Sequence, residues 1–272
     1  MDGQSWEARG GSFGQGAEVY EQTRPGYTTD TVRWILGEHP LAVLDLGAGT
    51  GQLTRRLIAC GHATTAVEPD QDMLAQLVAT TPLATALPGS AEDIPVPDAS
   101  QDALLISHAY HWFDPEPAHR EFARVLKPGG VLAALWNLRD EEIPWSAELS
   151  SILRGEDAGA ARDTSAAIML HGTLAALRSA DRAGLSGWLA SPSFGSDFGP
   201  VSQGFFPNRT RHSAQTLVDL IRSRSYYLTS SPDRKAELES QVRTLATSHP
   251  DLAGNDEFDL HYVTVVFRAE RR

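Results

Sequence analysis

The stretch that decides the fold of this chain is VLDLGAGTG, residues 43–51. An apolar run contains an acid, Asp45, near its end, and glycines then occupy positions 47, 49 and 51. An amphipathic segment, 52–60, follows directly. Glycine is needed where a backbone turns sharply or approaches a ligand closely. The stretch therefore predicts a strand, a tight turn and a helix, with the turn at the strand end where open α/β sheets bind nucleotide-like ligands.

The glycine spacing and the preceding acid distinguish between possible ligands. A dinucleotide fingerprint reads G-x-G-x-x-G and places a pyrophosphate at the helix N-terminus, whereas the third glycine here comes one position earlier. A carboxylate at Asp45 would repel a pyrophosphate and attract an ammonium group. S-adenosyl-L-methionine carries an ammonium and a sulfonium but no phosphate, so it fits better than NAD. The alternative is a strand-to-helix turn without a ligand, which would leave the entropic cost of three glycines without a gain.

A second acid lies at the distance expected for ribose recognition. Residues 63–67 form a short apolar run, and Glu68 follows it about twenty residues after the glycines. An acid at this place can accept hydrogen bonds from both ribose hydroxyls. Glu68 does not separate S-adenosyl-L-methionine from NAD, because both ligands offer those hydroxyls.

Five segments in order resemble the motifs of the class I S-adenosylmethionine-dependent methyltransferases. They are VLDLGAGTG, AVEPDQDML, two regions within GSAEDIPVPDASQDALLISHAYHWF, and RVLKPGGVLAALWN. FGQGAEVYEQTRPGY near the N-terminus and HAYHWFD further on resemble the small-molecule subgroup of the trans-aconitate type. The resemblance implies an α/β fold: a doubly wound, mostly parallel seven-stranded Rossmann-like sheet with a helical cap insertion.

The resemblance and the two acids together predict where the methyl donor binds. In the family, the loop that begins at Gly89 lies along the adenine, although the same residues also favour an ordinary turn or helix cap. The family's N-terminal segment folds over donor and substrate as a lid. The expected donor-binding residues are Tyr20, Arg24, Asp45, Gly47, Ala48, Gly49, Gly51, Glu68, Pro69, Met73, Ser90, Ala91, Glu92 and Ser107.

Aromatic and imidazole side chains follow the fourth predicted strand, where an acceptor would meet the donor. His108 and His111 are candidates for a catalytic general base. Tyr110 and Trp112 would bind the acceptor together with two N-terminal residues, Tyr27 and Arg24, whose guanidinium suits a carboxylate. The alternatives are packing of the aromatic rings in the core and a surface role for the arginine.

Composition limits the classes of partner. The 272 residues carry a formal net charge of -12, which argues against nucleic acid and against an anionic membrane surface. The single cysteine excludes a disulfide framework, and no spacing of ligand residues predicts a metal site. Without a signal segment or an apolar run long enough to span a bilayer, we expect a cytoplasmic protein, monomeric or homodimeric.

The order of predicted elements gives the organisation. Strands at 42–46, 64–67, 85–87, 103–107 and 131–136 alternate with helices, which implies a parallel sheet with right-handed crossovers. We expect a single methyltransferase domain over 1–272, made of a donor-binding core at 28–137, a helical insertion or cap at 138–200, and a C-terminal part at 201–272. That last part would complete the sheet with strands near 201–206 and at 261–268, the final strand antiparallel.

These observations predict an S-adenosylmethionine-dependent enzyme that methylates a small molecule by direct displacement, most simply at oxygen. One alternative is a donor-binding module, or a repurposed methyltransferase fold, that transfers no methyl group. Another is a methyltransferase acting on tRNA or protein. A NAD-dependent dehydrogenase fits least well.

Overall fold

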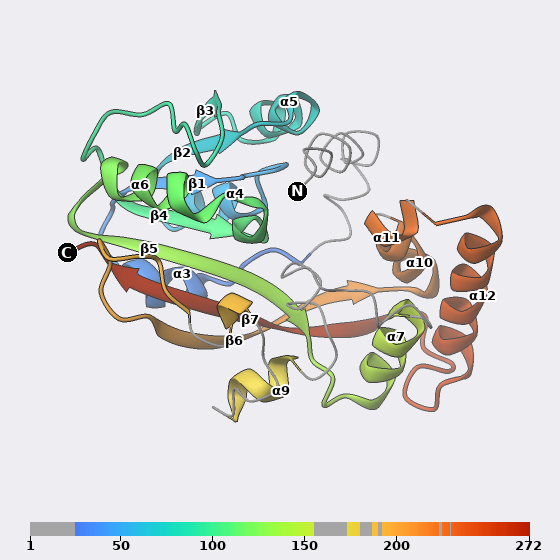
Figure 1. The fold of residues 1–272 in the computed structure, drawn as a ribbon. Coiled ribbons are helices and arrows are strands. Elements are labelled where there is room, and N and C mark those ends of the chain that lie inside the picture. Colours follow the sequence, from blue (N-terminus) through green and yellow to red (C-terminus); the bar gives the residue numbers. More distant parts are fainter. Residues whose placement is uncertain (1–24, 155–172, 180–186, 190–191, 223–224, 229) are drawn as a thin grey trace.

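The computed structural model describes residues 25–154, 173–179, 187–189, 192–222, 225–228 and 230–272. Its centre is one sheet of seven strands in the order β3-β2-β1-β4-β5-β7-β6 (Figure 1). The strands are β1 (Ala42–Leu46), β2 (Ala63–Glu68), β3 (Thr85–Pro88), β4 (Gln101–Ser107), β5 (Leu126–Arg139), β6 (Ser202–His212) and β7 (Phe258–Glu270). β1 to β5 pair in parallel, and β7 runs antiparallel to both of its neighbours. The predicted seven-stranded, mostly parallel α/β fold is confirmed.

Helices cover both faces of the sheet and one of its ends. The α-helices are α3 (Thr29–Leu36), α4 (Gln52–Ala59), α5 (Gln71–Thr80), α6 (Pro115–Val125), α7 (Pro144–Arg154), α9 (Thr173–Arg178), α10 (Ala214–Arg222), α11 (Ser225–Leu228) and α12 (Pro232–Ser248). Two short 3-10 helices are η2 (Tyr110–Trp112) and η4 (Gly187–Leu189). In the described ranges, no helix combines the length and the apolar character needed to cross a bilayer.

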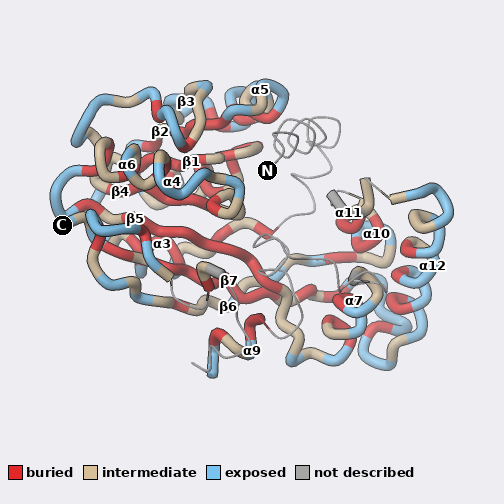
Figure 2. Tube along the Cα trace, in the orientation of Figure 1, coloured by how far each residue is buried: buried red, intermediate tan, exposed pale blue. Residues whose placement is uncertain are grey.

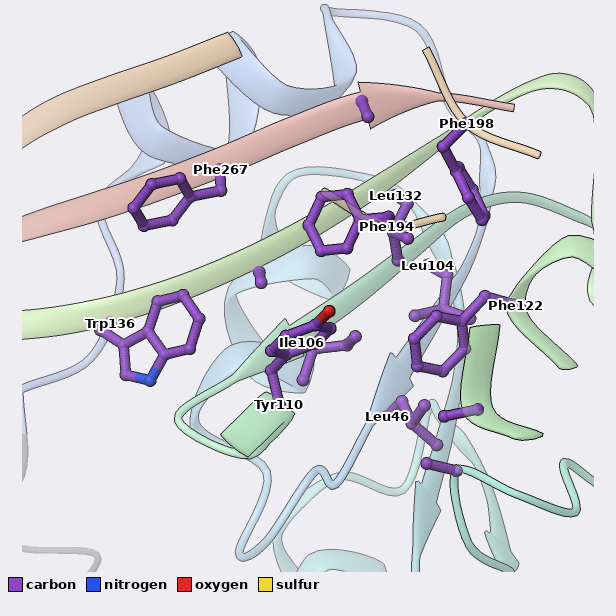
Figure 3. Packing of buried hydrophobic residues seen from close by; sticks show 14 of the residues in the cluster. Leu46, Leu104, Ile106, Tyr110, Phe122, Leu132, Trp136, Phe194, Phe198 and Phe267 are labelled. Atoms are coloured by element: carbon purple, nitrogen blue, oxygen red, sulfur yellow. The ribbon is translucent and has the colours of Figure 1, made fainter. Parts of the chain in front are cut away.

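The central strands are buried on both faces, so their sequences are almost continuously apolar. Because side chains alternate along a strand, Val43 packs on one face with α3 and α4. Its neighbour Leu44 packs on the other face, with α6 and the segments that follow α9. Figure 2 shows the resulting band of buried residues through the middle of the sheet. The second face is rich in aromatic rings, and Figure 3 shows Phe122, Phe194 and Phe198 within this layer.

A separate hydrophobic cluster lies beyond one end of the sheet. It joins α7, α10 and α12 to the first residues of β7, with Trp145, Leu149 and Tyr262 fully or almost fully buried. Figure 1 shows these helices gathered together beside α11. The helices at this end thus come from residues on both sides of position 200, and α10 to α12 lie in the chain between β6 and β7.

Two predicted elements differ from the observed ones. The segment 127–130, which precedes the fifth predicted strand at 131–136, falls within β5, but the pairing of β4 with β5 jumps from Leu126 to Val131. These four residues therefore bulge out of the ladder, and Gly129 takes a φ of 77°. β6 extends to His212, well past the predicted end, because it pairs with β7 over its whole length at the edge of the sheet.

Candidate donor and acceptor site

The glycine turn leaves the sheet at the end of β1. Gly47, Gly49 and Gly51 all adopt positive φ, at 67°, 58° and 90°, which disfavours any residue with a Cβ. The backbone amides of Gly47 and Ala48 donate to the carbonyl of Val67, at 2.9 and 3.1 Å. Gly51 then starts α4 as its N-cap. The turn predicted from the glycine spacing is confirmed, and β2 holds it against the sheet.

Glu68 braces the same turn from the end of β2. Its Oε2 accepts from the amide of Gly49 at 2.8 Å, and its Oε1 accepts from the amide of Asp70 at 3.0 Å. Burial raises the pKa of this carboxyl, while the two amide donors act in the opposite direction. Pro69 is exposed, and the sulfur of Met73 lies 3.9 Å from where a Cβ on Gly49 would stand. These residues, expected to bind the donor, come together around one loop.

Asp45 lies beneath the turn and is completely buried. Its Oδ2 accepts from Thr54 at 2.6 Å, but its Oδ1 has no hydrogen-bond partner among the described residues. Burial raises its pKa to about 7, with the Glu68 carboxylate adding to this rise and the Thr54 hydroxyl opposing it. A buried carboxyl with an unused oxygen is costly unless a cation or a donor completes it.

His108 follows β4 in a left-handed conformation, with φ at 53°. Its amide donates to the carbonyl of Leu135 at 3.0 Å, and its ring Nε2 accepts from the backbone amide of Asn137 at 2.9 Å. A nitrogen that accepts a hydrogen bond carries no proton, so the imidazole is neutral with its proton on Nδ1. As long as this bond holds, Nε2 cannot serve as the general base expected at this position.

A pocket opens at the carboxyl ends of β1 and β4, the place where ligands bind in open α/β sheets. Six of its residues were predicted for the site: Tyr27, Gly47, Ala48, Gly49, Ser107 and His108. Four were not: Pro25, Thr50, Gln52 and Asn137. The signal that could have found Asn137 is a lone amide at the end of an apolar strand. Within the described ranges, no group of His, Cys, Asp or Glu side chains could hold a metal ion.

The aromatic run after β4 divides between core and surface. Tyr110 turns into the apolar layer, where its hydroxyl lies 2.8 Å from Nε2 of His119 and burial raises its pKa. Figure 3 shows it beside Ile106. Trp112 is 37% exposed, and the centroids of the His111 and Trp112 rings lie 4.9 Å apart. The structure does not bring these three residues to the pocket lining, and Tyr110 takes the packing role that the sequence left open.

The loop after β3 is held by local hydrogen bonds. Ser90 Oγ accepts from the amide of Glu92 at 3.3 Å, and Glu92 Oε1 accepts from the amide of Asp114, the N-cap of α6, at 3.1 Å. Ala91 is buried in the core. The turn and cap roles that these residue types favour are therefore present in the structure. The predicted residues Tyr20 and Arg24 lie outside the described residues.

Arg124 on α6 clamps this loop. Its guanidinium makes a two-pronged pair with Glu121, both contacts at 2.7 Å, and donates to the carbonyls of Ile94 and Val96 at 2.7 and 2.9 Å. It also pairs with Asp98 at 2.8 Å. Only the planar fork of arginine can serve these acceptors together.

Arg124→Lys is expected to lower the free energy of unfolding by about 1–3 kcal/mol, because an ammonium cannot replace the fork and leaves acceptors unpaired. Urea denaturation followed by circular dichroism measures this change. Arg120→Lys is the matched control on the same helix, since the exposed pair of Arg120 with Glu116 contributes little. Equal stability of the two variants would contradict the clamp.

The comparisons with known proteins agree with this geometry. The family model of the methyltransferase domain matches residues 44–134. An uncharacterized methyltransferase of Mycobacterium tuberculosis is 39% identical over 258 residues, which cover 95% of each protein. This chain belongs to the class I S-adenosylmethionine-dependent methyltransferases.

Two further methyltransferases resemble this chain, one in its fold and one in part of its sequence. A candidate type II methyltransferase from Anaeromyxobacter dehalogenans has the same fold, with a TM-score of 0.64 at 22% identity over 91% of this chain and 97% of that one. A malonyl-[acyl-carrier protein] O-methyltransferase of Erwinia pyrifoliae is 36% identical over 116 residues, 42% of this chain and 40% of that protein.

The residues of this methyltransferase fit its donor. The unused Oδ1 of Asp45 and the raised pKa describe a buried acid that lacks a cation, and S-adenosylmethionine brings two positive charges. A Cβ on Gly47 would stand 2.7 Å from the Cβ of Ala109, so the turn packs directly against the residue that follows His108 and leaves no room for a side chain there. Glu68, predicted to bind the ribose, contacts the glycine turn through the amide of Gly49 and is not among the residues that line the pocket.

Proposed function

We propose that this methyltransferase methylates a small molecule at a carboxylate oxygen, as a member of the trans-aconitate-type subgroup would. The observation that carries the proposal is the lining of the pocket. Every described residue that lines it is uncharged, and its one imidazole has Nε2 engaged by the amide of Asn137. A carboxylate nucleophile needs no base, whereas a hydroxyl or an amine needs one more often.

Three further observations support the proposal. The formal net charge of -12 disfavours a polyanionic acceptor such as tRNA. Arg24, one residue before the pocket segment, has the side chain that suits a carboxylate. The relative from Erwinia pyrifoliae is by name an O-methyltransferase of malonyl-[acyl-carrier protein].

Bound S-adenosylmethionine would supply an activated methyl group on a sulfonium. The chain's own contribution is alignment and exclusion of water, and alignment alone can supply about 7–11 kcal/mol of a barrier. Glu68 and the glycine turn would hold the ribose and the amino-acid end. Tyr27 and His108 would form the walls between which the acceptor oxygen meets the methyl carbon, the oxygen gaining a bond to carbon as the carbon–sulfur bond breaks.

The test is methyl transfer from radiolabelled donor to a panel of di- and tricarboxylates, phenols, amines, tRNA and bulk protein. We expect label in a carboxylate, released as volatile methanol by mild alkali, because methyl esters hydrolyse and methyl ethers and methylamines do not. Calorimetry should first show binding of S-adenosylmethionine and S-adenosylhomocysteine. Alkali-stable label, or label in RNA or protein, would contradict the proposed acceptor class, and absence of donor binding would contradict the site.

A further inference from the structure

The segment 25–27 forms one wall of the pocket but belongs to no helix or strand. Tyr27 within it is only 4% exposed. Because this segment has no ladder of backbone hydrogen bonds, its position depends on the packing of Tyr27 in the cluster with α3 and α4 and on what the carbonyl groups of Pro25 and Gly26 contact. Those contacts come from side-chain amides on two strands far along the chain, Asn137 on β5 and Asn208 on β6.

Asn137 is buried and each polar atom of its side chain is engaged. Its Nδ2 donates to the carbonyls of Pro25 and Gly26, at 3.1 and 3.2 Å. Its Oδ1 accepts from the hydroxyl of Thr264 on β7 at 2.6 Å. Because the hydroxyl donates to the oxygen, the nitrogen must face the pocket segment.

Asn208 completes the arrangement from the edge strand. Its Nδ2 donates to the carbonyl of Gly26 at 2.7 Å and to Oδ1 of Asn137 at 3.2 Å. Its own Oδ1 accepts from the amide of Arg209 at 2.9 Å, which fixes the orientation of the amide group. Two side-chain donors therefore converge on the single carbonyl of Gly26.

Asn137 also contacts the opposite wall of the pocket. The backbone amide of Asn137 donates to the ring of His108, so one residue ties both walls together. A buried polar network of this kind stabilises little compared with apolar packing, but when every member is satisfied it specifies one geometry. A network that fixes geometry on both sides of a pocket is placed to control binding.

We propose that Asn137 and Asn208 form an amide latch that holds segment 25–27 against the glycine turn and thereby sets the affinity for the methyl donor. The latch rests on the proposed function, because it presumes that the donor occupies this pocket. Asn208 does not line the pocket and acts through Gly26, so it is a positioning residue. Asn137 both lines the pocket and carries the latch.

Asn208→Asp is the sharpest test, since it keeps the shape of the side chain and removes both donors. One oxygen still accepts from Arg209, and the other then faces the carbonyl of Gly26. We expect calorimetry to show a donor Kd raised about tenfold or more, the loss expected when a buried acceptor loses its donor. Asn208→Ala should weaken binding in the same direction, and Asn255→Asp, at an exposed turn, is the matched control.

Two readouts separate positioning from general destabilisation. Chymotrypsin cleaves after aromatic residues, so release of the latch should speed formation of the fragment that ends at Tyr27, while Tm changes by less than about 4 °C. With an acceptor identified by the methyl-transfer panel, the KM for the donor should rise about tenfold while kcat at saturating donor falls by less than about threefold. Thr264→Val, which leaves Asn208 untouched, should give a smaller effect of the same sign.

The outcomes are distinct. Wild-type affinity and wild-type cleavage at Tyr27 in both Asn208 variants would overturn the latch. A raised Kd with a lower Tm and unchanged cleavage would also overturn it, as loss of stability alone. If the wild-type chain binds no donor, the proposed function fails, and the cleavage rates still decide whether the amides hold the segment.

Discussion

Gly47→Ala is expected to abolish measurable binding of S-adenosylmethionine. The φ of Gly47 is 67°, a conformation that costs an alanine about 1–2 kcal/mol. In addition, the new methyl group would stand 2.7 Å from the Cβ of Ala109, which is closer than two non-bonded carbon atoms can approach. Because Ala109 directly follows His108, relieving this contact displaces the turn, the pocket wall, or both.

Gly37→Ala separates the two causes. Gly37 also has a positive φ, 77°, but a Cβ there meets no atom within 4 Å. The variant should lose about 1–3 kcal/mol of unfolding free energy and keep wild-type donor affinity. Calorimetry and urea denaturation on both variants provide the comparison. Wild-type affinity in Gly47→Ala would show that the turn does not cradle the donor.

Asp45→Asn is expected to have opposite effects on binding and on stability. The raised pKa of Asp45 means that the folded protein without donor is destabilised by its own ionised carboxyl. Removing that charge at pH 8 raises the free energy of unfolding by an amount on the order of 4 kcal/mol. The buried amide that replaces the carboxyl has unpaired groups, which lower it again by about 1–3 kcal/mol. We propose that the Asp45 carboxylate pairs with the donor's cationic groups, and the same change would remove it, so affinity should fall about 10- to 150-fold.

The raised pKa of Asp45 determines how the stability of the wild-type chain changes with pH. The carboxyl of an unfolded chain ionises near pH 4, and the folded Asp45 ionises at about 7. Between these values the unfolded state releases its proton first, so wild-type stability falls as pH rises. The charge penalty that Asp45→Asn relieves should therefore be near zero at pH 4, where the unpaired amide leaves the variant less stable than wild type, and should grow as pH rises and level off above 7.

Donor affinity should change with pH in the direction opposite to stability. It should rise with pH toward 7 in the wild-type chain, because the donor's charge favours the ionised carboxyl, and lack this rise in Asp45→Asn. Asp30→Asn, an exposed position in the first turn of α3, is the control for removing a negative charge. An Asp45→Asn chain that binds donor as tightly as wild type, or that is less stable at pH 8, would contradict this account of Asp45.

The parts of the site that the sequence predicted are those built from neighbouring residues. The turn at 47–51 and the acid at Glu68 depend on strand, turn and helix following one another, and that order is written in hydrophobic spacing and in glycines. Their types also determine their chemistry, because a buried acid beneath a glycine turn suits a cation and not a phosphate.

The roles after β4 could not be read in the same way. His108 and Tyr110 are two residues apart, yet one faces the pocket and the other the core. The left-handed φ of His108 and the short helix η2 decide these directions, and neither follows from residue type. A general base at His108 was a reasonable expectation from composition, but the amide of Asn137 engages the nitrogen that would act.

By itself, the sequence predicted the strands of the sheet, the glycine turn and the family to which this methyltransferase belongs, because each can be read from the order and spacing of residues along the chain. Only the tertiary structure decided the walls of the pocket. Asn208 and Gly26 are 182 positions apart, and Asn137 and Pro25 are 112 apart. Amides so distant meet only after the sheet has brought β5, β6 and β7 together, and no local pattern encodes which carbonyl each of them will find.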